Sequence, residues 1–323
     1  MRVPDRKPKG VPNRAGNVPP RAAAGTLGAL CFTAALLAPA AAGSALAATR
    51  PAAAAPALSV PLLTSTTSKS FSAAVSSLKT AVSSAGMMVL GELNQAGALS
   101  VAGLHLKGAE SFFVGNPVVG KKFFQMNPAI GAVIPVHLYV FVNSSGRTEL
   151  AYLDPSRLAG VVDPMLAKPA AMLAGAAAKI VRAVTGQAPS ATATVRSLTF
   201  VTWTSPRSFS ATVSSLKTAV SSAGMMVLGQ LNQAGALSVA GLHLAGAESF
   251  YVGNPVVGKK FFQMNAIAGI EIPVGFYLWV DKAGKTEIGY FAPTPVLSGA
   301  SAQLASGGPM FSKMAAKIAD ATA

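Results

Sequence analysis

The sequence predicts an α+β protein made of two tandem copies of a small domain, with helices packed on a largely antiparallel sheet. Three observations predict this class. The chain repeats itself at a fixed offset, strand and helix signals alternate inside each repeat, and short polar turns join some neighbouring strands. Helices mixed with hairpins in this way belong on one face of an antiparallel sheet.

The repeat has an offset of 138 residues, at which Phe71 recurs as Phe209 and Lys179 as Lys317 without an insertion or deletion. From Phe71 to Asn127 the copies differ at only four positions. A repeat this long is a complete domain and not a solenoid unit. We therefore expect a Pro/Ala linker at 48–57, a first repeat domain at 58–185, a linker rich in Pro, Ser, Ala and Thr at 186–195, and a second repeat domain at 196–323.

The first copy opens with a strand and a capped helix. Ser59–Thr67 is rich in Val, Leu and Thr, which is typical of a strand. Ser70 can cap a helix that begins at Phe71 and buries one apolar face, and Gly86 can end it in the left-handed conformation. Two further elements follow, a buried strand at Met87–Leu93 and a short helical segment at Ala96–Gly103.

The second half of the copy contains the central strand. After a strand at Glu110–Val114, the step Asn116-Pro117 supplies a cap and a first helical residue. Ile134–Val142 is apolar on both faces, which indicates a strand in the middle of the sheet. The copy then closes with a hairpin turn at Asn143–Gly146, a strand at Thr148–Leu153 and an Ala-rich helix at Met172–Ala183.

The amino terminus reads as a signal peptide at 1–47. Six basic residues precede an apolar run, Gly25–Leu37, and Ala45-Leu46-Ala47 fits the preference of a signal peptidase. An uncleaved anchor is the alternative, but the run is short and Pro39 interrupts it, whereas a spanning helix needs about 20 apolar residues. We expect an exported protein, periplasmic or extracellular, without a transmembrane span after cleavage.

Cysteine content and charge narrow the classes of function. The one cysteine, Cys31, lies in the predicted signal peptide, so the mature chain would have no disulfide, thiolate ligand or cysteine nucleophile. The net charge of +15 falls to +10 without that leader, which favours an anionic ligand or surface as partner. Charged residues make up only 11% of the chain, so we expect no nucleic-acid binding.

The order of these motifs resembles domain of unknown function family 302. The resemblance rests on the helix that opens at Phe71, the run Phe113-Val114-Gly115-Asn116-Pro117, the step Ile134-Pro135 and the hairpin that ends at Tyr152, and it covers about 85 to 100 residues of each copy. The family implies a fold and no established activity. Its members often carry Cys-Arg after that proline, where this chain has Val136-His137 and Val274-Gly275.

A glycine-rich run in both copies suggests an anion site. Gly115–Lys122 matches the first seven positions of a phosphate-binding loop, but it ends in Lys where a hydroxyl must bind magnesium. A capped helix with a solvated Lys pair is the plainer interpretation. A weaker anion site at the helix start stays open, because free amides and the helix dipole favour negative charge. Its residues would be Asn116, Lys121, Lys122, Asn254, Lys259 and Lys260.

Other chemistry is sparse. His105 and Glu110 recur as His243 and Glu248, while His137 corresponds to Gly275, and no spacing typical of a zinc site occurs. No nucleophile elbow is present. We expect no catalytic residue, metal or cofactor, and a non-enzymatic binding or interaction module with the same surface in each copy. The alternatives are an enzyme with a site around His105/Glu110 and His243/Glu248, or a purely structural envelope protein.

Overall fold

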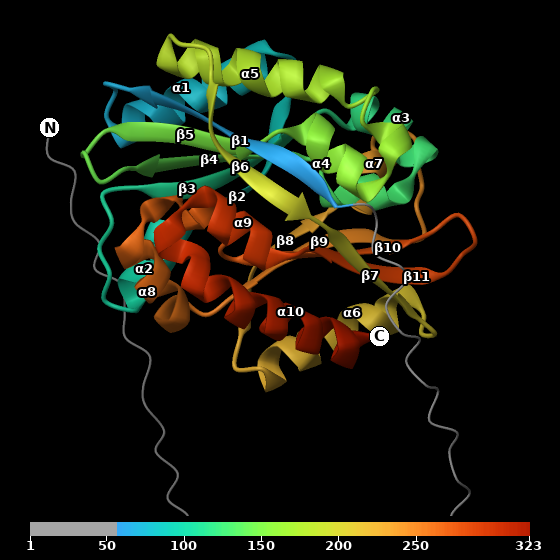
Figure 1. Cartoon of the computed structure of the whole chain (residues 1–323). Helices are drawn as coiled ribbons and strands as arrows, with labels where there is room; N and C mark the ends of the chain where they lie inside the picture. The colour runs from blue at the N-terminus through green and yellow to red at the C-terminus, as the bar shows by residue number, and fades with distance from the viewer. Residues whose placement is uncertain (1–56) are drawn as a thin grey trace, which may run out of the picture. The chain divides into compact units, whose positions relative to one another are not determined.

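The computed structural model describes residues 57–323, which lie within one compact unit (Figure 1). The predicted signal peptide, 1–47, lies outside the described residues, as does all of the 48–57 segment except Ala57.

The first copy forms an antiparallel sheet with the strand order β2-β3-β4-β5-β1-β6. Strand β4 lies inside this sheet and buries side chains on both faces, which confirms the expectation of a central strand. The strands are β1 (Leu58–Thr67), β2 (Met88–Asn94), β3 (Ala109–Gly115), β4 (Val136–Val142), β5 (Thr148–Leu153) and β6 (Ser190–Leu198).

The second copy repeats this sheet in the order β8-β9-β10-β11-β7. Each strand takes the place of its counterpart 138 residues earlier, so the predicted α+β fold of two like copies is confirmed. The strands are β7 (Phe200–Ser205), β8 (Met226–Asn232), β9 (Ala247–Gly253), β10 (Val274–Val280) and β11 (Thr286–Phe291).

Strand β6 departs from the expected domain organisation. Residues 190–195, which we expected in a linker, pair with β1 and extend the first sheet. The open edge of β1 offers unpaired backbone groups, and a segment rich in Thr, Ala and Val can satisfy them. Near the end of β6, where the pairing with β1 shifts register, Ser197 has a φ of 53°, which is rare for a residue other than glycine.

The helices begin and end where local signals place them. The Ser70 hydroxyl accepts the Ala73 N–H at 3.3 Å at the start of α1, and Gly86 follows its end with a φ of 66°. Asp154 caps α4, a helix that we did not predict, by accepting the Ser156 N–H at 2.8 Å. The helices of the first copy are α1 (Phe71–Ser84), α2 (Gln95–Val101), α3 (Pro117–Met126), α4 (Pro155–Val162) and α5 (Ala171–Thr185), with 3-10 turns η1 (Pro128–Ala132) and η2 (Pro164–Leu166).

The second copy carries the matching helices α6 (Phe209–Ser222), α7 (Gln233–Ser238), α8 (Pro255–Met264), α9 (Pro293–Ala300) and α10 (Gly308–Thr322), with 3-10 turns η3 (Ala266–Ile270) and η4 (Ala302–Gly307). In the first copy α5 packs beside α1, and both contact β4 (Figure 1). In the second copy α10 packs beside α6 in the same way.

The two copies bury a shared interface with reciprocal contacts. The Tyr139 hydroxyl donates to the Ala266 carbonyl at 2.8 Å, and the equivalent Tyr277 hydroxyl donates to the Pro128 carbonyl at 2.9 Å. A Cβ at Gly131 would overlap the Tyr277 ring, so this close approach requires glycine. Reciprocal contacts between like surfaces are the rule in two-fold homodimers, and here both partners belong to one chain.

Candidate functional site

A cavity of about 120 Å³ lies between the two copies. Its walls come from β3, β4 and η1 of the first copy and from β9, β10 and η3 of the second. Equivalent residues of both copies meet there, so the cavity lies across the internal interface and belongs to neither copy alone. The equivalent pairs in its walls include Ser111 and Ser249, Phe113 and Tyr251, Gly131 and Gly269, Val133 and Glu271, and His137 and Gly275.

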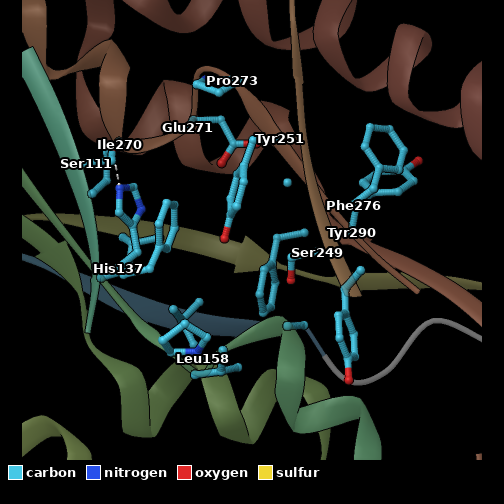
Figure 2. Close-up of a pocket in the computed structure, with 18 of the residues that line it drawn as sticks. Ser111, His137, Leu158, Ser249, Tyr251, Ile270, Glu271, Pro273, Phe276 and Tyr290 are labelled. Atoms are coloured by element: carbon cyan, nitrogen blue, oxygen red, sulfur yellow. Dashed lines mark hydrogen bonds between the residues drawn. The ribbon is translucent and has the colours of Figure 1, made fainter. Parts of the chain in front are cut away.

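His137 supplies an imidazole from β4. Its Nε2 lies 2.8 Å from the Ser111 Oγ, which also accepts the Gln95 Nε2 at 2.5 Å (Figure 2). Burial lowers the pKa of His137 to about 4, so the ring is neutral at neutral pH. The Ser111 hydroxyl hydrogen then remains for His137 Nε2, which places the ring proton on Nδ1.

An aromatic stack crosses the interface beside this imidazole. The ring centroid of Phe113 lies 5.0 Å from that of His137 and 4.4 Å from that of Tyr251. Phe113 and Tyr251 hold equivalent positions on β3 and β9, so their contact joins the two copies. Burial raises the pKa of the Tyr251 phenol, and a hydrogen bond with Ser249 opposes this shift. The phenol therefore stays protonated.

Glu271 brings a carboxyl group to the cavity from the end of η3. Figure 2 shows it beside Tyr251. Burial raises the pKa of the Glu271 carboxyl well above its usual range, which favours the neutral form. Within residues 57–323 the carboxyl has no hydrogen-bond or ion-pair partner.

Gln95 leaves a second acceptor unpaired at this site. Its Nε2 faces the Gly269 carbonyl at 3.5 Å and the Ser111 hydroxyl, and a carbonyl can only accept. The amide orientation is thereby fixed, and Gln95 Oε1 is buried with no hydrogen-bond partner. The residues around the cavity thus include one fully buried acceptor, Gln95 Oε1, and one half-exposed carboxyl, that of Glu271, without hydrogen-bond partners.

The polar groups of the cavity differ between the copies. His137 corresponds to Gly275, Glu271 corresponds to Val133, and Tyr251 corresponds to Phe113. The cavity therefore presents different chemical groups on its two sides. Our sequence analysis missed Tyr251 and Glu271 because it searched for residues that the copies share.

The predicted anion-binding residues lie elsewhere, at the starts of α3 and α8. The Asn116 side chain accepts the Val118 N–H at 2.9 Å and donates to the Gly86 carbonyl at 2.7 Å. Asn254 makes the equivalent bonds in the second copy. These asparagines cap their helices and occupy amides that an anion would need.

The four predicted lysines divide into two kinds. The Lys121 amine donates to the Ala240 carbonyl at 3.3 Å, and the Lys259 amine donates to the Ala102 carbonyl at 3.1 Å, so both bind the other copy. Lys122 and Lys260 are exposed. Anion binding at these helix starts stays a prediction that relies on the exposed pair.

The His105 and Glu110 pair of the alternative enzyme site does not form. His105 is exposed and shares no hydrogen bond with Glu110. The pKa of Glu110 is raised by burial and by Glu92, whereas Lys79 lowers it. In the second copy Glu248 accepts the Gln230 amide at 2.7 Å.

Between residues 57 and 323, no group of three or more His, Cys, Asp or Glu side chains could hold a metal ion. None of the helices in that range combines the length and the apolarity needed to cross a membrane.

The fold and the interface define a class of α+β protein with two fused copies and a cavity between them. Residues 63–185 and 201–322 both match the family described as Domain of unknown function DUF302, and the chain belongs to this family. Among solved structures it is similar to one described as the crystal structure of uncharacterized conserved protein DUF302 from Bacillus stearothermophilus. That match has 22% identity and a TM-score of 0.36, and covers 38% of this chain and 97% of the other. No curated protein matches the chain.

Proposed function

We propose that this chain is an exported, non-enzymatic binding protein whose ligand occupies the cavity between the two copies. The observation that carries the proposal is the Glu271 carboxyl, which lies half-exposed in the wall of a 120 Å³ cavity with no hydrogen-bond or ion-pair partner among residues 57–323. Buried polar groups are almost always paired in folded proteins. A ligand with hydrogen-bond donors would complete this site.

The size and the surroundings of the cavity narrow the ligand further. A single water needs roughly 10–15 Å³ of such space, so the cavity can hold a small organic molecule. The neutral His137 ring, the Phe113 and Tyr251 rings and the preference of Glu271 for its neutral form offer no fixed charge to a ligand. We infer a flat, uncharged molecule with amide-like donors.

Catalysis by Ser111 is the rival function, since its Oγ lies 2.8 Å from a neutral imidazole. Three observations favour binding instead. Ser111 is only 1% exposed, and Gln95 already donates to its oxygen. Among residues 57–323 no carboxylate holds the His137 ring through its other nitrogen, as the third member of a catalytic triad would. Ser111→Ala should therefore leave ligand binding in place, whereas loss of turnover on an ester substrate would support the rival.

The binding proposal is tested with two matched probes. Benzamide presents two amide hydrogens, and N,N-dimethylbenzamide presents none. Benzamide should raise the thermal midpoint of the wild-type protein with increasing concentration, because a ligand that binds the native state stabilises it. The dimethyl analogue should not. Equal shifts from both probes, or none from either, would contradict a site that requires donors.

Export is proposed from the basic leader, the apolar run and the Ala45-Leu46-Ala47 step. The intact mass of the protein recovered outside the cytoplasm should correspond to a chain that starts at Ala48. A recovered chain that retains Met1 would contradict export by signal cleavage.

A further inference from the structure

A second cavity, of about 170 Å³, lies in the first copy and is separate in character from the site between the copies. Its walls come from the end of α1, the start of β2, the junction of β3 and α3, and the start of α5. Helix α7 of the second copy closes one side through Gln233, Ala236 and Leu237. Helices α3 and α7 contact each other at this point.

The walls of this cavity are apolar. Its lining includes Leu90, Val119, Phe124 and Leu173, and no lining residue is charged. Asn116 contributes a polar amide to the lining, but its side chain already caps α3 and donates to the Gly86 carbonyl. A charged ligand would find no compensation here, because burying a charge without a partner is strongly unfavourable.

Gln233 is the other polar residue in the lining, and it is 5% exposed. Its Nε2 donates to the Ser249 hydroxyl at 2.6 Å and to the Gly131 carbonyl at 3.2 Å. Both bonds tie the side chain to the interface between the copies. Gln233 Oε1 is buried without a hydrogen-bond partner, and the other lining residues apart from Asn116 are apolar or glycine.

The second copy carries larger side chains at two of the equivalent positions. Leu173 corresponds to Phe311, and Ala176 corresponds to Met314. Phe311 is 2% exposed and packs edge-on against Phe261 with ring centroids 5.0 Å apart. Two residues in the wall of this cavity are thus smaller than their counterparts in the second copy.

We propose that the first copy binds a small apolar molecule, or the apolar end of a larger one, in this cavity. The volume of this cavity indicates the size of its ligand, because an engineered dry cavity of about 150 Å³ lined by Leu, Ile and Phe in another protein binds benzene. Met172 lines the cavity and is 57% exposed, so it stands at the mouth. Its flexible thioether can yield to an entering ligand.

The test uses toluene and a variant that copies the second domain. Toluene should bind the wild-type protein saturably and shift the methyl resonances of Leu173 and Leu237 in a ¹³C-methyl spectrum. Leu173→Phe with Ala176→Met should weaken toluene binding at least tenfold, because it places two larger side chains in the cavity wall. Binding to this variant with wild-type affinity would overturn the proposal.

Two further measurements keep the test independent of that variant's folding and of the site between the copies. Saturable toluene shifts confined to methyl groups away from Leu173 and Leu237 in the wild-type protein would also overturn the proposal. Gly275→His adds a ring to the cavity between the copies and leaves the apolar cavity of the first copy unchanged. This variant should therefore bind toluene as the wild type does. Loss of toluene binding in Gly275→His would show that toluene binds between the copies, and this result would overturn the proposal.

Discussion

His137 gives the stability of the protein a defined dependence on pH. Burial lowers the pKa of its ring from 6.5 to about 4, so the unfolded chain takes up this proton at higher pH than the folded chain. The contribution of the neutral ring is present above pH 6.5 and is lost as the pH falls towards 4. The gap corresponds to about 3 kcal/mol of unfolding free energy. His137→Gln should flatten this part of the curve, which urea unfolding between pH 4 and 7 measures.

The control for this prediction is the exposed His105, which lies outside the cavity. His105→Gln should retain the wild-type pH dependence. If His137→Gln loses stability towards pH 4 as steeply as the wild type, the imidazole is not buried as described.

Glu271 gives the stability of the protein a pH dependence of the opposite sign to that of His137. Burial raises the pKa of its carboxyl, so its contribution to stability is present below the unfolded pKa of 4.5 and is lost as the pH rises through the folded pKa. Glu271→Val copies Val133 of the first copy and removes this charge. The variant should gain stability relative to the wild type as the pH rises, by chemical denaturation at pH 4 and pH 8. A difference between the two proteins that stays constant with pH would contradict burial of the carboxyl.

The sequence predicted few of the residues in the candidate site, for a reason visible at position 137. We searched for chemistry common to both copies, and His137 is matched by Gly275. The resemblance to the family did single out this position, because Val136-His137 replaces its common Cys-Arg. Glu271 had no such signal, since its importance depends on burial at an interface that the sequence does not display.

At the scale of elements, the reciprocal tyrosines hold the copies together. Tyr139 and Tyr277 each donate to a backbone carbonyl of the other copy and are almost fully buried. Replacing either by Phe should cost about 1–3 kcal/mol, because a buried carbonyl loses its partner. Urea unfolding of the two single variants measures this cost, and the two values should be similar because the contacts are reciprocal.

Tyr152 supplies the matched control for these tyrosines. Its hydroxyl is buried without a hydrogen-bond partner. Tyr152→Phe should therefore be neutral or slightly stabilising. A Tyr152→Phe cost equal to that of Tyr277→Phe would show that ring packing, and not the bond to the other copy, sets the energy.

Most elements could be predicted because their signals are local. Ser70 caps α1, Asn116-Pro117 opens α3, and Gly86 takes a positive φ, each within a few residues of the pattern that predicts it. Strand β6 could not be predicted from such signals, because its partner, the edge of β1, lies more than 120 residues away in the chain. Its Thr- and Ala-rich composition also suits a linker.

At the scale of the whole molecule, duplication explains both the fold and the cavity. Strand β4 is apolar on both faces, so the face opposite its helices also requires cover. His137 and Tyr139 lie two residues apart on β4 and so share one face. The Tyr139 hydroxyl reaches Ala266, which shows that the second copy supplies this cover. Because the two copies are separate segments of one chain, substitutions can occur in one copy alone. The two sides of their interface can therefore carry different residues.

The central claim is that the two copies build a single ligand site between them. Calorimetric titration of benzamide into the wild-type protein and into Gly275→His tests it most directly. A Cβ at Gly275 would meet only the Tyr251 ring, at 3.5 Å and 3.7 Å, so the backbone can accept a histidine that stacks there as His137 stacks on Phe113. We predict one benzamide per wild-type chain and at least tenfold weaker binding to Gly275→His. Two equivalent sites per chain, or unchanged binding to the variant, would contradict the claim.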